Sequence, residues 1–381
     1  MGTSDKADSV GGVHPDQRPI QEGGSEMSSS ANELVQRALV LSGGGGRGAY
    51  QVGVCQVLEE MSWRPDLVLG NSIGATNGAM LIAPHPDLNL SGIELLQQVW
   101  HCEMSNKVLH QASSEWPAYV RWAINLVMRI LQALQKPPKS AEADELFLQL
   151  IEELSVDLGS VEREKVSLMG VVQKVLGKPS LMDRDGWQRL LDQKVDFRHL
   201  REHCPPYFGI AVTDVLTGAP RYFWNHVPPG VAGVASEITS DHVMASSSIP
   251  GVYRATYLEE QEGREWWDGA CVANSPIGPA IDAGAKDIVV VLMTPWHPEP
   301  QGDGVPLRAS STTVLDALDR FLDWTMLAPL RSELKRKGPD QRVRIVSPEK
   351  IQGVVQMVDY DPEESELMIK QGIEDARRIL Q

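Results

Sequence analysis

Residues 41–48 read Leu-Ser-Gly-Gly-Gly-Gly-Arg-Gly, and residues 70–74 read Gly-Asn-Ser-Ile-Gly. Each stretch follows a short apolar run, at 38–41 and at 67–69, and each opens a stretch of helical character. A G-x-S-x-G turn between a strand and a helix holds its serine hydroxyl on a sharp bend, with small residues on both sides. The sequence therefore predicts a strand, a glycine loop and a helix, followed by a second strand that leads into the turn at Ser72.

The glycine run has the character of a site for a developing negative charge. Amide groups in the first turn of a helix have no intrahelical acceptor, so several of them can point at an oxyanion. We expect the amides at 44–46 to be the donors, and Arg47 to brace the loop or to touch an anionic head group. The candidate oxyanion loop comprises Gly43, Gly44, Gly45, Gly46, Arg47 and Gly48.

A third motif lies far downstream, where residues 266–270 read Trp-Trp-Asp-Gly-Ala. Its acid, Asp268, stands in an Asp-Gly-Ala turn just after an apolar-aromatic run. Nearly two hundred residues separate this aspartate from Ser72. The two motifs can work together only if the tertiary structure brings them into contact.

The three motifs, in this order, resemble those of the patatin-like phospholipase family. That family has a glycine-rich oxyanion loop, a G-x-S-x-G nucleophile elbow and an acid in a D-G-A or D-G-G turn. Residues 245–253 read Ala-Ser-Ser-Ser-Ile-Pro-Gly-Val-Tyr and are similar to the stretch that precedes the catalytic aspartate of the family. The resemblance covers roughly residues 37–82 and 206–295.

The resemblance implies a dyad in which Ser72 is the nucleophile and Asp268 is its base. A serine hydroxyl is a poor nucleophile at neutral pH and needs such a base. A carboxylate is a weak base, but burial between Trp266 and Trp267 would raise its basicity by desolvation. The elbow and the acid motif are completed by Gly70, Gly74, Gly269 and Ala270.

The resemblance also implies an activity, which is hydrolysis of lipid acyl esters, as by a phospholipase A or an esterase, through an acyl-enzyme. The expected substrate is a lipid or another acyl ester, and neither a cofactor nor a metal is expected. Two alternatives stay open on the same fold: an acyltransferase, in which an alcohol replaces water, and a non-enzymatic scaffold. A scaffold is expected to have lost the serine or the acid, and both are present.

Two other kinds of protein share parts of these patterns. The glycines within 43–48 also match the G-x-G-x-x-G of dinucleotide-binding proteins, which need an acid at the end of the next strand. The acid at about the required distance from the glycines, Asp66, lies before that strand and not at its end. A Ser-His-Asp hydrolase would need a histidine after its acid, and of nine histidines only His297 qualifies. The Asp-Gly-Ala context and the leading glycine loop fit the dyad better.

The order of apolar runs predicts an α/β fold. A strand, a glycine turn, a helix and a further strand form a βαβ unit, and such alternation implies a mostly parallel sheet covered by helices. With the patatin-like resemblance, we expect a three-layer α/β/α sandwich with a helical lid insertion. The candidate strands are 38–42, 67–70, 208–213, 288–293 and 342–346.

The domain organisation expected from composition has a polar tail and one catalytic domain. Residues 1–34 are rich in Gly, Ser, Asp and Glu and are predicted to be a disordered tail. The catalytic domain is expected to span 35–381, with a helical insertion or lid at about 84–200. C-terminal helices are expected at about 313–381.

One part of the expected insertion has an unusual pattern. Within 118–134 the polar residues lie three or four apart and form a narrow, partly basic stripe on an otherwise apolar helix. This pattern is typical of a helix that lies on lipid, which would give peripheral membrane contact. The alternative, which the pattern favours slightly, is a helix buried in the lid or at a dimer interface.

Composition excludes several partners and compartments. A net charge of −16, from 35 basic and 51 acidic residues, argues against nucleic-acid binding and against polybasic membrane attachment. No signal peptide and no membrane-spanning stretch is visible, so a cytoplasmic protein, peripheral to membranes at most, is expected. The widely spaced cysteines argue against a disulfide framework or structural zinc: Cys55, Cys102, Cys204 and Cys271.

Overall fold

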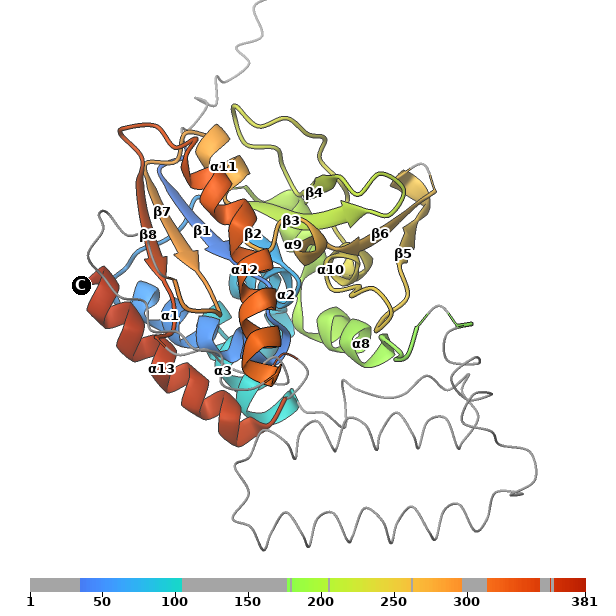
Figure 1. Ribbon diagram of the computed structural model, residues 1–381, viewed down its shortest axis with the longest axis horizontal. Helices are drawn as coiled ribbons and strands as arrows, with labels where there is room; N and C mark the ends of the chain where they lie inside the picture. Colours follow the sequence, from blue (N-terminus) through green and yellow to red (C-terminus); the bar gives the residue numbers. More distant parts are fainter. Residues whose placement is uncertain are drawn as a thin grey trace, which may run out of the picture. The chain divides into compact units, whose positions relative to one another are not determined.

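A mixed eight-stranded sheet forms the centre of the described structure (Figure 1). Its order is β5-β6-β3-β2-β1-β7-β8, and β4 also pairs with β3. Strands β3, β2, β1, β7 and β8 run parallel, whereas β4, β6 and β5 add antiparallel pairs at one side. The strands are β1 Arg37–Leu41, β2 Leu67–Asn71, β3 Tyr207–Asp214, β4 Pro220–Trp224, β5 Thr256–Leu258, β6 Arg264–Asp268, β7 Asp287–Val291 and β8 Arg342–Val346.

The computed structural model describes 35–104, 177–178, 180–204, 206–261, 263–296, 314–349, 357 and 360–381, with the backbone alone at 314–320. The α-helices are α1 Ala49–Glu60, α2 Ile73–Ile82, α3 Gly92–Gln98, α8 Asp185–Lys194, α9 Phe197–Glu202, α10 Ser240–Ser246, α11 Gly278–Asp282, α12 Val314–Leu334 and α13 Pro362–Leu380. Short 3-10 turns occupy Gly45–Gly48, Pro86–Leu88, Glu259–Gln261 and Gly269–Cys271, and a π-helical turn occupies Val99–Glu103.

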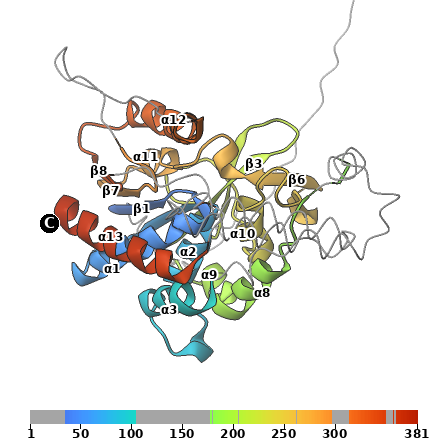
Figure 2. The ribbon, with the colours of Figure 1, turned by 60° about the horizontal axis from the view of Figure 1, so that its bottom comes forward.

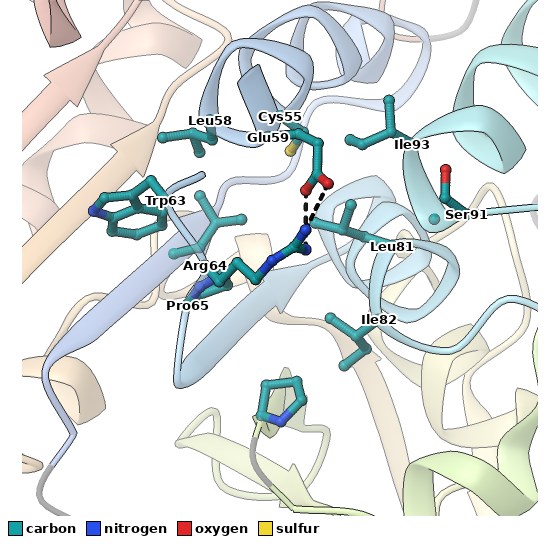
Figure 3. A pocket seen from close by; sticks show the side chains of 13 residues that line it. Cys55, Leu58, Glu59, Trp63, Arg64, Pro65, Leu81, Ile82, Ser91 and Ile93 are labelled. Atoms are coloured by element: carbon teal, nitrogen blue, oxygen red, sulfur yellow. Dashed lines mark hydrogen bonds and ion pairs between the residues drawn. The ribbon is translucent and has the colours of Figure 1, made fainter. Parts of the chain in front are cut away.

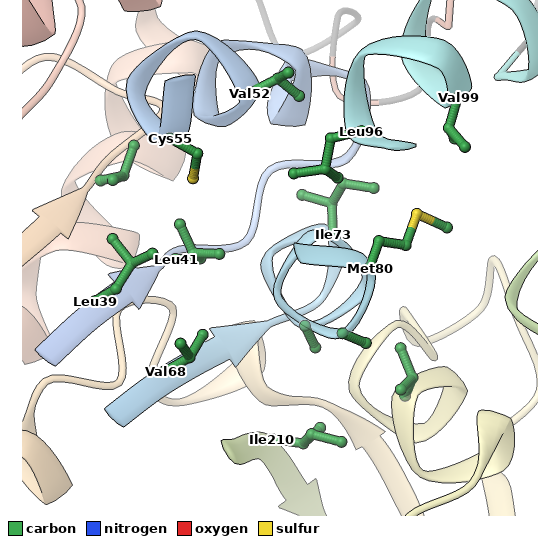
Figure 4. Packing of buried hydrophobic residues seen from close by; sticks show 14 of the residues in the cluster. Leu39, Leu41, Val52, Cys55, Val68, Ile73, Met80, Leu96, Val99 and Ile210 are labelled. Atoms are coloured by element: carbon green, nitrogen blue, oxygen red, sulfur yellow. The ribbon is translucent and has the colours of Figure 1, made fainter. Parts of the chain in front are cut away.

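Helices cover both faces of the sheet (Figure 2). Side chains alternate between the faces of a strand, so Leu39 and Leu41 of β1 pack on one side and Val40 on the other. The first side holds α1, α2, α3 and α13, and its core is drawn in Figure 4. The second side holds α11 and α12, with Leu327 and Leu330 of α12 in its core. This arrangement confirms the predicted three-layer α/β/α sandwich.

The five strands predicted from the sequence correspond to β1, β2, β3, β7 and β8, with ends within a few residues of the predicted ones. Three further strands, β4, β5 and β6, were not predicted. The continuous apolar runs of β1, β2 and β7 are typical of parallel strands covered on both faces.

Much of the expected insertion at 84–200 lies outside the described residues, including the whole of 118–134. Its described parts contain α3, α8 and part of α9, and an isolated bridge joins Pro84 to Val195. The tail at 1–34 also lies outside the described residues. The disordered tail, the lid and the lipid-facing helix therefore stay predictions. No helix among the residues described has the length and apolar character needed to cross a membrane.

Candidate active site

Ser72 occupies a sharp turn between β2 and α2. Its φ of 53° and ψ of −124° lie in a region that residues with a side chain rarely adopt. The neighbouring glycines make this turn sterically possible. A Cβ atom on Gly70 would lie 2.5 Å from the Cα of Ala75, and one on Gly74 would lie 2.2 Å from the Leu41 carbonyl oxygen. The backbone at Ser72 thus makes a sharp strand-to-helix turn, and the role of Ser72 as nucleophile stays a prediction.

A second serine, Ser246 at the end of α10, holds this strained turn in place. The Ser72 N–H donates to the Ser246 hydroxyl oxygen at 2.8 Å, and that hydroxyl donates to the Ala211 carbonyl at 2.6 Å. Ser246 is completely buried, so its one proton and one of its lone pairs are both used. The sequence assigned it no role. The signal that could have found it was its place in the 245–253 block.

The sheet brings Asp268 to the same place. Asp268 is the last residue of β6 and pairs with Val212 of β3, while the preceding residue of β3, Ala211, pairs with Asn71 of β2. Because β3 lies between the two strands, Asp268 and Ser72 come together although they are distant in the chain. The Ala270 amide donates to the carboxylate at 2.8 Å, and the side chains of Ser72 and Asn71 also hydrogen-bond to it.

The environment of Asp268 makes its carboxylate unusually basic. Burial raises its pKa to about 6, while hydrogen bonds from the Ala270 amide, Ser72 and Asn71 act in the opposite direction. Desolvation disfavours the charged form, and no cation among the residues described pairs with this carboxylate to offset it. A carboxylate with this pKa is ionised at neutral pH and still able to take up a proton.

Two asparagines connect the glycine loop to the elbow. The Asn71 side-chain amide donates to Asn274 Oδ1 at 3.1 Å, and the Asn274 side-chain amide donates to the Gly43 carbonyl at 3.3 Å. The Gly43 N–H donates in turn to the Asn274 carbonyl at 3.2 Å. A Cβ atom on Gly43 would lie 2.5 Å from Asn274 Oδ1, so a side chain there would displace this asparagine pair. The sequence singled out neither asparagine, because nothing local distinguishes them from ordinary turn residues.

The glycine loop leaves three backbone amides open. The Gly43 amide is engaged with Asn274, and the Arg47 amide donates to the Gly44 carbonyl at 3.3 Å. Among the described residues the amides at 44–46 have no acceptor; their role as oxyanion donors stays a prediction. Gly45 has φ +58°, and a Cβ there would lie 1.8 Å from the Met357 carbonyl oxygen. The loop can therefore present N–H groups to an anion close to Ser72.

The Arg47 side chain is buried and lies 3.7 Å from the carboxylate of Asp323 on α12. This ion pair links the glycine loop to α12 in the second helical layer. Gly48, at the end of the loop, packs on α2, where a Cβ would lie 2.5 Å from Ile73 Cγ1. Gly269 lies against the elbow, where a Cβ would meet Asn71 Oδ1 at 2.3 Å.

The alternative patterns find little support in the geometry. Asp66 accepts hydrogen bonds from the amides of Gln36 and Arg37, at the end of the sheet opposite to Ser72. His297 lies outside the described residues, and no histidine within them hydrogen-bonds to Ser72 or Asp268. No group of three His, Cys, Asp or Glu side chains in the described part of the chain is placed to hold a metal ion.

A separate pocket of about 250 Å³ opens at the amino ends of the strands (Figure 3). Its lining is mostly apolar, from α1, α2 and the loop before β2, and it includes the buried Cys55. Arg64 donates two hydrogen bonds to Glu59 at the pocket, at 2.7 and 3.1 Å. Since Ser72 lies at the carboxyl ends of the strands, this pocket is not part of the candidate active site.

A family model of patatin-like phospholipases matches residues 39–281, which include the elbow, the glycine loop and Asp268. This match covers more than half of the chain, so the protein belongs to the patatin-like phospholipase family, a family of lipid hydrolases.

The chain is also similar to individual proteins. It is 57% identical to the lysophospholipase nte1 of Aspergillus terreus over 42 residues, which are 11% of this chain and 3% of that protein. It is similar in structure to VipD from Legionella pneumophila, with a TM-score of 0.42, 15% identity and coverage of 91% of this chain and 67% of VipD. ExoU from Pseudomonas aeruginosa gives a TM-score of 0.30 and 14% identity, over 91% of this chain and 53% of ExoU.

Proposed function

We propose that this protein hydrolyses the acyl ester bonds of lipids, with Ser72 as nucleophile and Asp268 as base. The observation that carries the proposal is the contact between a strained elbow serine and a buried carboxylate whose pKa is about 6. The open amides of Gly44, Gly45 and Gly46 beside this pair complete the set of groups that acyl transfer needs.

The reaction proceeds in two halves. In the first, Asp268 takes the proton of the Ser72 hydroxyl while Oγ attacks the ester carbonyl carbon, and the carbonyl oxygen becomes an oxyanion bound by the loop amides. Asp268 returns the proton to the leaving alcohol, and the acyl group remains on Ser72. In the second half, water loses a proton to Asp268 and attacks the acyl-enzyme, and the fatty acid leaves as Ser72 regains its proton.

The pKa of Asp268 suits both halves. A general base works best when its pKa lies near the working pH, because it must be ionised at rest and must hold the proton in the transition state. An ordinary aspartate, with a pKa near 3.9, would be ionised but too weakly basic. Burial raises the pKa of Asp268 to about 6.

The experiment that tests the function compares wild type with Ser72→Ala on short and long p-nitrophenyl esters, a phospholipid and a lysophospholipid. We expect wild type to release free fatty acid from at least one lipid and the variant to release none. Addition of a primary alcohol separates hydrolysis from acyl transfer, because an acyltransferase would form the new ester in preference to free acid. A wild-type protein inactive on all these esters would contradict the proposal and favour a scaffold.

The pH dependence tests the identity of the base. With Asp268 as the base, kcat/KM of wild type should fall about tenfold per pH unit below pH 6, because only the ionised carboxylate is active. His297→Ala should keep the same activity and the same acid limb. Loss of activity or of the limb in His297→Ala would mean a histidine-based hydrolase and would contradict the dyad.

Ser246→Ala tests the support of the elbow. Removing this hydroxyl leaves the Ser72 N–H buried without an acceptor, at a cost of about 1–3 kcal/mol in the free energy of unfolding. We expect kcat to fall about 10- to 100-fold while KM changes little, because the nucleophile is displaced and the lipid-binding surface is not.

The matched control for Ser246 is its neighbour Ser247, whose hydroxyl, among the described residues, donates only to the Val243 carbonyl at 3.4 Å. Ser247→Ala should change kcat less than twofold or so, since an alanine there breaks no contact with the elbow. Equal kcat values for the two variants would show that Ser246 does not position the nucleophile.

A further inference from the structure

Helix α12 presents an unusual outward face. From residue 321 onward its exposed positions recur at spacings of three, one, three and four, which places them on one side of the helix. Phe321 is 60% exposed and Trp324 is 66% exposed. The members of this outward face are Phe321, Trp324, Thr325, Ala328 and Ser332. A surface helix normally turns its apolar side chains inward and its charges to solvent, and here large aromatic rings face outward.

Charge is absent from this outward face. Between 321 and 330 the only ionisable side chain is Asp323, which is buried and turned toward Arg47 of the glycine loop. The chain as a whole carries a net charge of −16, so an uncharged stripe of this length differs sharply from the rest of the composition. An uncharged face with exposed Trp and Phe fits an electrically neutral, amphipathic surface such as zwitterionic lipid head groups over acyl chains.

The outward face also lies near the candidate active site. Asp323, next to Trp324 in the chain, contacts the loop that follows the carboxyl end of β1. Farther along, Arg336 pairs with Asp282 of α11, near the amino end of the sheet. The helix therefore runs from the Ser72 end of the sheet toward the opposite end, lengthwise beside the strands (Figure 1). Phe321 and Trp324 lie in the first turns of α12 whose side chains the structure describes, near the Ser72 end.

The exposed area favours lipid over a second copy of the chain. A whole aromatic side chain has roughly 150–250 Å² of surface, so two rings that are 60% and 66% exposed present about 200–300 Å² together. A stable dimer buries about 800 Å² on each partner, which is far more. Binding to a lipid interface has no such threshold and scales with the apolar area buried, so a small aromatic surface fits weak, reversible attachment to lipid.

We propose that the outward face of α12 docks on a lipid surface, with Phe321 and Trp324 inserted among the head groups. Because Asp323 and Arg47 tie the same helix to the glycine loop, docking would bring Ser72 to the membrane. The proposed function enters this proposal only where lipid hydrolysis after docking is concerned. Lipid binding itself is measured without any turnover.

The test uses the full chain carrying Ser72→Ala, so that no lipid is consumed, and phosphatidylcholine vesicles in a sedimentation assay. The variant F321S/W324S should bind vesicles about tenfold more weakly or worse, because serine removes the inserted rings. The conservative variant F321L/W324F should keep most of the binding. The matched control is Leu367→Ser on α13, a leucine that is 59% exposed on another helix, and it should bind as the parent does.

A second readout uses the same surface substitutions with Ser72 intact. Activity on vesicle phospholipid should fall in F321S/W324S in parallel with binding, while activity on a soluble short-chain ester stays within about twofold. Vesicle binding equal to that of the parent would overturn the proposal. So would an equal loss on the soluble ester, or a dimeric parent that becomes monomeric in F321S/W324S without a change in vesicle binding. If no ester is cleaved but binding falls as expected, the proposed function fails and the docking surface stands.

Discussion

Replacing Ser72 by alanine is expected to reduce kcat/KM for ester hydrolysis by about 10⁴-fold or more, since the acyl-enzyme can no longer form. The residual rate would come from the open loop amides alone. The fold should be retained, because the Ser72 backbone keeps its hydrogen bond to Ser246. Hydrolysis of a p-nitrophenyl ester measures the effect, and a variant with wild-type activity would rule out Ser72 as nucleophile.

Ser72→Gly separates the strain of the elbow from its chemistry. At φ 53° a side chain costs about 1–3 kcal/mol, which alanine keeps and glycine removes. Glycine loses about 0.5–1 kcal/mol through its greater freedom in the unfolded chain, so a net gain of about 1 kcal/mol in unfolding free energy is expected. Urea unfolding should therefore rank Ser72→Gly as more stable than Ser72→Ala, with both inactive. The reverse order would mean that the elbow is not strained.

Asp268→Asn is expected to reduce kcat/KM by about 10³-fold or more, because an amide cannot accept the serine proton. The amide has nearly the shape of the carboxylate, and its oxygen can still accept the Ala270 N–H, so the loss would reflect chemistry and not misfolding. Activity within tenfold of wild type would show that another group serves as the base.

The same variant is expected to unfold at a higher urea concentration than wild type at pH 7. The folded pKa of Asp268 is raised to about 6, above its unfolded value of 3.8. Because the carboxyl pKa is higher in the folded state, the folded protein holds this proton more tightly than the unfolded chain does. The protonated carboxyl therefore stabilises the fold at low pH, and this contribution is lost as pH rises through 6. At pH 7 the buried charge costs about 3 kcal/mol, which asparagine removes. The gain should vanish near pH 4.

Asp214 at the end of β3 is the matched control for this stability effect. Burial opposes its ionisation, but hydrogen bonds from Thr217, Arg264 and Leu216 outweigh burial and lower its pKa. A lowered pKa means stability that is present above the unfolded value and lost at acid pH, so Asp214→Asn should destabilise the protein at pH 7. A shift of the same sign for Asp214→Asn and Asp268→Asn would contradict the assignment of their environments.

The parallel strands β1, β2 and β7 were predictable because each is a continuous apolar run, which can be recognised without knowing its partner strand. Strands β4 and β5 were not predicted, since Pro220–Trp224 and Thr256–Leu258 are mixed in polarity and form strands by pairing with β3 and β6 at the antiparallel side of the sheet. Such edge pairing is decided by the neighbouring strand and leaves little trace in the local sequence. The unusual face of α12 was missed for a related reason, because its apolar spacing suggests ordinary core packing until the buried side is known.

The sequence by itself determined the three motifs and the parallel α/β core, because a glycine turn, a strand and a helix are set by local backbone freedom and side-chain period. Only the tertiary structure decided which of these motifs meet. The pairing of β3 with both β2 and β6 brings Asp268 to Ser72, and burial raises the pKa of that carboxyl. Ser246 and Asn274, which are distant in the chain, hydrogen-bond to the elbow and to the glycine loop. Contact and desolvation depend on groups far apart in the chain, so no stretch of sequence specifies them alone.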